Sequence, residues 1–306
     1  MEKIYRIIGD IHGRINWRQL IDFSNPDVVY IFLGDYTDPY YYNEDKVTRE
    51  QMLEVIDEII SLKKEHPDNV ILLWGNHDLQ YIINDGDTNR FDMMLCPTLH
   101  KIFTDNEKLF HGIAYNIGEK YLVSHAGVTR QWYCQLRGQH YAKDETTLEE
   151  IARHINDIWD SGRDGKTMFT FKECCTKFSD YYGTSSTHSP LWIRPWSLWQ
   201  HNLFGFNSGK IQVVGHTISE PMTGKHDDWG RIGTIGTTYG DKLSEQELSD
   251  GLYINDGEHK CLLTENDPEK VDIILCDCLA KETACIEIDK NLNWRKMTPE
   301  RLKQEK

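Results

Sequence analysis

Five short motifs contain side chains that could bind metal ions, and each follows directly after an apolar run. They are Gly9-Asp10-Ile11-His12-Gly13, Gly34-Asp35-Tyr36-Thr37-Asp38, Gly75-Asn76-His77-Asp78, Ser124-His125-Ala126-Gly127 and Gly215-His216-Thr217. Asp, Asn and His offer hard and borderline oxygen and nitrogen ligands, and no cysteine is among them. Such a set can hold two divalent cations side by side, and a pair of cations with one open face can split phosphate esters.

The apolar runs before these motifs have the length and composition that are typical of strands. Stretches with helical periodicity fall between several of them, as in an α/β chain. The predicted strands are Ile4–Ile8, Val28–Leu33, Val70–Trp74, Tyr121–Val123 and Ile211–Val214, with closing strands at Val271–Leu275 and Ala284–Ile288. The predicted helical stretches are Trp17–Phe23, Val47–Lys64 and Leu148–Trp159, with the start of another at Leu79–Ile83.

Strands of one sheet deliver the loops at their carboxyl ends to a common rim, so we expect the five motifs to converge. Burying these polar groups together without partners would be costly, and a metal ion offsets that cost.

The length of the chain allows one large domain or two ordinary ones. Its 306 residues are 39% hydrophobic and 11% aromatic, which is enough for a sizeable core. We interpret residues 1–306 as a single domain. The weaker pattern from about 131 to 189 predicts an elaborated connection within it, and the polar tail after about residue 293 predicts a surface helix.

The charge of the chain argues against some classes of partner. A formal net charge of −15 disfavours a nucleic-acid-binding surface and an anionic membrane. A phosphate substrate suits this charge if bound metal ions supply positive charge locally. The first predicted strand begins near the initiator Met, and no apolar run approaches the ~18 residues of a membrane span. We therefore expect a cytoplasmic protein whose eight cysteines are free thiols.

The order of the motifs resembles that of the calcineurin-like metallophosphoesterases. Gly-Asp-x-His-Gly, Gly-Asp-x-x-Asp, Gly-Asn-His-Asp, His-Ala-Gly and Gly-His-Thr follow one another between Gly9 and Thr217. The set is most similar to the phosphoprotein phosphatase branch, which includes bacterial serine/threonine phosphatases and diadenosine tetraphosphatases. The resemblance implies an α/β (α+β) fold, a four-layer sandwich of two mixed β-sheets flanked by helices.

The resemblance also implies a role for each site residue. Two divalent metal ions would be held, with Mn preferred and Fe or Zn suited to the same ligands. The implied ligands are Asp10 and His12 for the first ion, Asp35 as a bridge between both, and Asn76, His125 and His216 for the second. A metal-bridging hydroxide would attack phosphorus in line. His77 would protonate the departing alkoxide, Asp38 would orient His77, and Asn76 would also contact the phosphate.

The chain departs from the family pattern at one phosphate-binding position. Phosphoprotein phosphatases usually continue Asp-Arg-Gly in the second motif, and that arginine binds the phosphate, whereas Pro39 follows Asp38 here. Arg194 lies in a Pro-Leu-Trp-x-Arg segment that resembles one in some bacterial phosphatases, so it is our candidate for bidentate phosphate contact. Arg14 and Arg130 also lie near metal motifs, and we interpret both as surface residues.

Three functions are compatible with these observations. The first is a phosphomonoesterase that acts on phosphoserine or phosphothreonine in proteins. The second is a hydrolase of a small phosphoester, such as a nucleotide or a dinucleoside polyphosphate. Asp78 favours this function, because protein phosphatases usually have Glu at that position. Trp192, Trp196 and Trp199 could stack on a nucleobase, although we interpret them as core or cleft wall. The third is a non-catalytic scaffold, which is disfavoured because every ligand position carries a competent residue.

Overall fold

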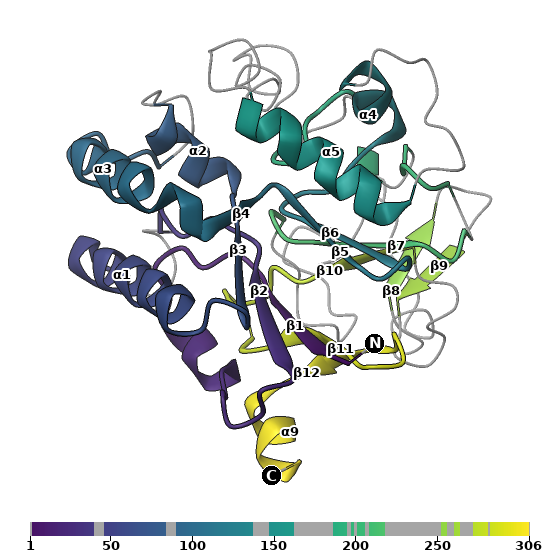
Figure 1. The fold of residues 1–306 in the computed structure, drawn as a ribbon, viewed down its shortest axis with the longest axis horizontal. Coiled ribbons are helices and arrows are strands. Elements are labelled where there is room, and N and C mark those ends of the chain that lie inside the picture. The colour runs from purple at the N-terminus through teal and green to yellow at the C-terminus, as the bar shows by residue number, and fades with distance from the viewer. Residues whose placement is uncertain are drawn as a thin grey trace.

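Two mixed β-sheets form the centre of the protein, and helices cover their outer sides (Figure 1). The computed structural model describes residues 2–39, 46–83, 90–136, 147–161, 186–194, 197–198, 201–205, 208–217, 252–255, 260–263, 272–280 and 282–305. The two sheets, with the helices outside them, confirm the predicted α/β sandwich of two mixed sheets.

The larger sheet has six strands in the order β12-β11-β1-β2-β3-β4. Its strands are β1 (Ile4–Ile8), β2 (Val28–Phe32), β3 (Val70–Leu73), β4 (Phe110–Gly112), β11 (Cys285–Ile288) and β12 (Trp294–Met297). β1 to β4 run parallel, and β11 and β12 add an antiparallel edge. The carboxyl ends of β1, β2 and β3 are therefore neighbours on one rim.

The smaller sheet has four strands in the order β10-β7-β6-β5. They are β5 (Ala114–Ile117), β6 (Tyr121–Ser124), β7 (Ile211–Val214) and β10 (Ile273–Leu275). β6, β7 and β10 run parallel, and β5 pairs antiparallel with β6. A separate hairpin joins β8 (Leu252–Asn255) to β9 (Lys260–Leu263). The larger sheet thus presents four adjacent parallel strand ends, and the smaller sheet presents three.

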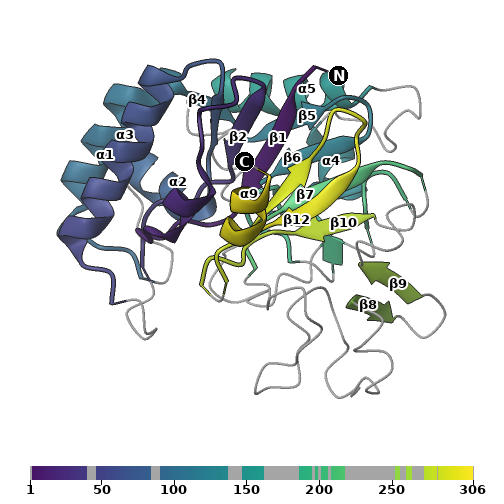
Figure 2. The same cartoon turned by 90° about the horizontal axis from the view of Figure 1, so that it is seen from below.

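The helices flank the sheets, as the turned view in Figure 2 also shows. They are α1 (Arg49–Glu65), α2 (Asn76–Ile82), α3 (Cys96–Asn106), α4 (Arg130–Leu136), α5 (Leu148–Ser161) and α9 (Pro299–Gln304), with 3-10 turns at Asn16–Leu20 and Glu107–Leu109. Thr48 caps α1 by accepting a hydrogen bond from the Gln51 N–H. Among the described residues, no helix is long and apolar enough to cross a membrane.

The core has two parts because successive strand side chains point to opposite faces of a sheet. Ile7 and Ile31 pack between the two sheets. Ile8 and Phe32, one position along, belong to the second cluster, which also contains buried residues of α1, α3 and α5. Nearly continuous apolar strands are what a sheet covered on both faces requires.

Most predicted elements are confirmed within one or two residues at each end, with four differences. The helix that was predicted from Leu79 begins at Asn76, so its first turn contains the third motif. Trp17–Phe23 contains a short 3-10 helix, Asn16–Leu20, where a longer helical stretch was predicted. The tail after Asn293 begins as β12, which pairs with β11 in the sheet and buries Trp294 and Met297, before the predicted helix appears as α9. Of the predicted connection at 131–189, α5 and most of α4 are described, while 137–146 and 162–185 lie outside the described residues. The single-domain interpretation stays a prediction.

Candidate metal centre

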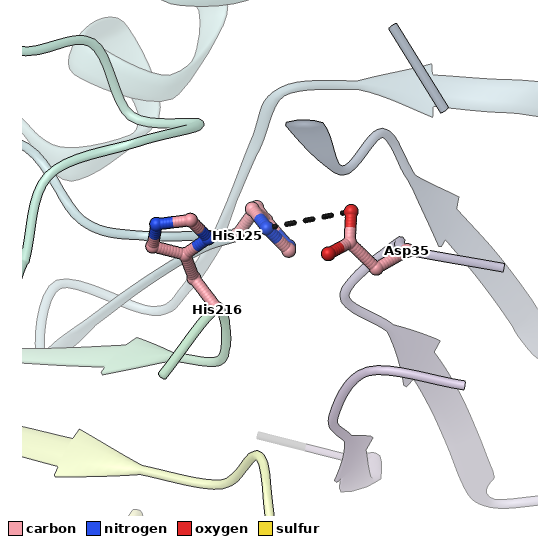
Figure 3. Close-up of side chains that lie close together, drawn as sticks. All are labelled: Asp35, His125 and His216. Atoms are coloured by element: carbon pink, nitrogen blue, oxygen red, sulfur yellow. Dashed lines mark ion pairs between the residues drawn. The ribbon is translucent and has the colours of Figure 1, made fainter. Parts of the chain in front are cut away.

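The five motifs lie at adjacent strand ends of the two sheets. Asp10, Asp35 and Asn76 follow β1, β2 and β3 in the larger sheet, and His125 and His216 follow β6 and β7 in the smaller one. Figure 3 shows Asp35 reaching toward His125 and His216 from the opposite sheet. The Nε2 atom of His125 lies 3.6 Å from the nearer Asp35 carboxylate oxygen. The predicted convergence of the motifs is therefore found.

Two groups of buried side chains could each hold a cation, and Asp35 belongs to both. The first group is Asp10, His12 and Asp35, and the second is Asp35, His125 and His216. In each group the ligand atoms lie within 4.8 Å of one another. A carboxylate shared by two ligand groups is compatible with the bridging role that the family resemblance implies for Asp35.

Backbone carbonyl groups fix the orientation of the three imidazoles. Nδ1 of His12 donates to the Thr37 carbonyl at 2.7 Å, and Nδ1 of His125 donates to the Leu33 carbonyl at 2.9 Å. Nε2 of His216 donates to the Trp192 carbonyl at 3.1 Å. Because a carbonyl only accepts, the second nitrogen of each ring keeps a lone pair directed into the site.

The lone pairs of the second group converge on one point. Oδ1 of Asn76 lies 2.8 Å from Nε2 of His125 and 3.0 Å from Nδ1 of His216. With the ring protons donated elsewhere, all three atoms are acceptors, an arrangement that repels without a cation and that a cation stabilises. Burial lowers the pKa of His12, His125 and His216, so the imidazoles are in the neutral form that binds metal.

The carboxylates of the first group also need a positive charge. Burial, together with the charges of Asp277 and Asp35, raises the pKa of Asp10 well above its usual range. Burial raises the pKa of Asp277 to about 7, and the charge of Asp277 helps to raise the pKa of Asp10, so one of the two carboxyls holds a proton in the absence of another positive charge. A divalent cation can replace that proton. The residues present therefore fit two metal ions.

Asp277 is a site residue that the sequence interpretation missed. It follows β10, the third parallel strand of the smaller sheet, and only 1% of it is exposed. The apolar run Val271–Leu275 predicts a strand, and Asp277 is the first acidic residue after it. The same signal that identified Asp10 and Asp35 could therefore have identified Asp277.

The loops that carry the ligands adopt unusual backbone conformations. His12, Asp35, Asp38 and His216 have φ angles of 46°, 50°, 57° and 63°, in the left-handed region that residues with a Cβ rarely adopt. Gly75 is required by close approach, because a Cβ there would overlap the Asp35 carboxylate. This backbone strain is maintained at the site by the surrounding packing.

Asp78 holds two of these loops together. Its buried carboxylate accepts hydrogen bonds from the Tyr36 N–H at 2.9 Å and from the Gly75 N–H at 3.0 Å. The Thr37 hydroxyl donates to it at 3.3 Å. Asp at this position therefore has a structural role, fixing the second motif against the third.

His77 and Asp38 form the predicted hydrogen-bonded pair. Nδ1 of His77 lies 2.7 Å from Oδ2 of Asp38, and the Tyr81 hydroxyl donates to the other oxygen of Asp38. The backbone N–H of His77 donates to Asp35 at 2.9 Å, which ties the pair to the metal ligands. The ring of His77 lies 5.4 Å from that of His12, centroid to centroid, so it stands beside the first group.

The structure places the three candidate arginines differently. Arg194 is partly exposed, and its guanidinium donates to the His216 carbonyl and to the Thr217 hydroxyl, both at 3.2 Å, beside the second group. Arg14 is only 4% exposed, so its interpretation as a surface residue was wrong; its charge lowers the pKa of Asp277. The Arg130 guanidinium donates to the Leu203 carbonyl at 3.4 Å.

Trp192 is buried, and its ring packs edge-on against the His216 ring, with centroids 6.0 Å apart. Its position supports the cleft-wall interpretation, while Trp196 and Trp199 lie outside the described residues. Five buried cysteines form no disulfide: Cys96, Cys134, Cys276, Cys278 and Cys285.

Comparison with known proteins agrees with the motif order. The family described as calcineurin-like phosphoesterase matches residues 6–220. The serine/threonine-protein phosphatase PP2A-like PPG1 of Candida albicans is 35% identical over 81 residues, which are 25% of this chain and 17% of that protein. A solved protein serine/threonine phosphatase from Saccharomyces cerevisiae, with similarity to human phosphatase PP5, is 14% identical with a TM-score of 0.44, over 97% of this chain and 79% of that chain.

Proposed function

Because the chain belongs to the calcineurin-like phosphoesterase family, we propose that it is a two-metal phosphomonoesterase that acts on phosphoserine or phosphothreonine in proteins. The observation that carries the proposal is the convergence of two buried ligand groups on Asp35, with a histidine–aspartate pair directly beside them. Ligands alone would fit a structural metal site, but an imidazole that a carboxylate orients directly beside them indicates proton transfer.

The two ligand groups would hold two divalent ions, with Mn²⁺ preferred. Asp10 and His12 would bind one ion, Asp35 would contact both, and the remaining ligands, Asn76, His125 and His216, would bind the other. Bound there, such ions supply a hydroxide-forming water and positive charge for the phosphate oxygens. The protein's own contribution is the fixed tautomer of each imidazole and the buried carboxylates, Asp10 and Asp35, whose negative charge would balance the ions.

His77 would donate a proton to the leaving oxygen of the substrate. Asp38 accepts the Nδ1–H of His77, so it positions the ring and stabilises the imidazole when that ring carries two protons. Tyr81 holds Asp38 from the other side. Arg194, partly exposed beside His216, would contact the phosphate oxygens, and Asn76 would share that role.

The substrate class is supported by three observations of unequal weight. The segment shared with a PP2A-like phosphatase supports a phosphoprotein. Asp78, which stands in place of the Glu that protein phosphatases usually have, favoured nucleotide hydrolysis in the sequence. In the structure it holds two loops together, which is a structural role. Trp192 is buried against His216 and is not available to stack on a nucleobase.

A parallel assay of the Mn²⁺-loaded protein tests the proposal. Phosphate release would be measured from phosphoserine and phosphothreonine peptides, diadenosine tetraphosphate and 2′,3′-cyclic nucleotides. We expect release from the phosphopeptides. Turnover confined to the dinucleotide would replace the proposal with nucleotide hydrolysis, and inactivity toward every phosphoester would favour a non-catalytic scaffold.

A further inference from the structure

Arg90 places a guanidinium against the histidine–aspartate pair. Its Nη2 lies 3.0 Å from Nε2 of His77, and its Nη1 donates to the Asp38 carbonyl at 2.5 Å. Arg90 lies in none of the five motifs, and it follows α2 in the sequence.

The segment that carries Arg90 is held in place by several independent contacts. Arg90 itself has a φ angle of 71°, in the left-handed region. The next residue, Phe91, stacks on the Tyr81 ring with centroids 4.8 Å apart, and the Asp92 N–H donates to the Tyr81 hydroxyl at 2.9 Å. Arg49 of α1 forms an ion pair with Asp92 at 2.5 Å. Tyr81 therefore connects this segment to Asp38.

The contact between Arg90 and His77 occupies the atom that must face the leaving group. A guanidinium only donates, so Nε2 of His77 accepts and Nδ1 carries the proton given to Asp38. A phosphate oxygen is charged and is a stronger acceptor than a neutral imidazole nitrogen. When a phosphate enters the site, the guanidinium gains by turning from His77 to the phosphate, which leaves Nε2 exposed to the leaving oxygen.

We propose that Arg90 is a phosphate-binding residue, which supplies from the segment after α2 the guanidinium that Pro39 cannot supply. This inference rests on the proposed function. Arg90 is partly exposed and stands beside His77, while Arg194 stands beside His216, so the two guanidinium groups reach the site next to different ligand groups.

The test measures the binding of inorganic phosphate to the full Mn²⁺-loaded chain by calorimetry, and its inhibition of p-nitrophenyl phosphate hydrolysis. Loss of hydrogen bonds from a charged donor predicts that Arg90→Ala weakens phosphate binding about 10- to 100-fold. Arg90→Lys keeps the positive charge but loses the two-pronged guanidinium group. Its affinity for phosphate should therefore lie between that of the wild type and that of Arg90→Ala. Metal content and melting temperature should match the wild type.

Arg153→Ala is the matched control, because the Arg153 side chain is 61% exposed on α5 and pairs with Asp157 one turn away. It should bind phosphate as the wild type does. Unchanged phosphate affinity in Arg90→Ala would overturn the inference. If the melting temperature of that variant is also lower, Arg90 has a purely structural role. If Arg90→Ala does not fold, wild-type affinity in Arg90→Lys overturns it equally.

The outcomes also separate this inference from the proposed function. If the wild type hydrolyses phosphoesters and Arg90→Ala binds phosphate as the wild type does, the phosphate-binding role of Arg90 is rejected and the proposed phosphatase function is retained. If Arg90→Ala binds phosphate more weakly but the wild type hydrolyses no phosphoester, the phosphate-binding role of Arg90 is retained and the proposed phosphatase function is rejected.

Discussion

Replacing Asp38 by Asn removes one charge at the centre of a chain of hydrogen bonds. At present Nδ1–H of His77 donates to Asp38 at 2.7 Å, and Nε2 accepts from Arg90 at 3.0 Å. In Asp38→Asn the Tyr81 hydroxyl can still donate to the amide oxygen, which turns the NH₂ group toward His77. If His77 keeps its proton on Nδ1, that N–H faces the introduced NH₂ group. If the proton moves to Nε2, that N–H faces the N–H groups of Arg90. Either arrangement leaves two donors in contact.

The size of the loss follows from the bond that disappears. A hydrogen bond to a charged group contributes about 1.5–3 kcal/mol, so kcat should fall roughly 10- to 150-fold where protonation of the leaving group limits the rate. A serine phosphate has such a leaving group. An aryl phosphate such as p-nitrophenyl phosphate leaves without help, so its kcat should fall much less.

The assay compares kcat for a phosphoserine peptide and for p-nitrophenyl phosphate in wild type and Asp38→Asn. Metal content should stay unchanged, because Asp38 belongs to neither ligand group. Asp157→Asn, at an exposed position of α5, is the control and should behave as the wild type. Equal losses on both substrates, or loss of metal, would refute the positioning role of Asp38.

Three further predictions concern the ligands, the phosphate and pH. Asp35→Asn should lower the metal content of both sites together in elemental analysis, because Asp35 belongs to both groups; loss of one ion alone would contradict the bridge. Arg194→Ala should raise the inhibition constant of inorganic phosphate about tenfold or more, and an unchanged constant would remove Arg194 from phosphate binding. In metal-free protein the pKa of Asp277 is raised to about 7, so its contribution to stability is lost as pH rises through that value. As pH rises from about 4 to about 7, the melting temperature of the chelator-treated protein should therefore fall relative to that of Asp277→Asn, a comparison that cancels the titration of the histidines, and saturating Mn²⁺ should abolish this difference.

The ligand positions could be predicted because strand ends leave a local signal. Each ligand follows an apolar run and accompanies a glycine, and parallel strands bring such positions to one rim. Asp35 and His216 were found in this way, although they come from different sheets. The facing of the two sheets was implied by the family resemblance and not by the residues themselves.

Other features depend on contacts between distant segments and leave no local signal. β12 reads as polar because Arg295 and Lys296 lie at its centre, yet Arg295 pairs with the buried Glu287 of β11, which also binds Arg6 of β1 at 2.8 Å. Charges that neutralise one another across three strands are invisible in a single strand's pattern. Arg90 is similar, because only folding brings it to His77.

The central claim is that Asp35 stands between two metal ions. Anomalous diffraction from crystals of the Mn²⁺-loaded protein tests it most directly. The claim predicts two peaks, one among Asp10, His12 and Asp35 and the other among Asp35, Asn76, His125 and His216. A single peak, or two peaks of which one lies away from Asp35, would contradict it.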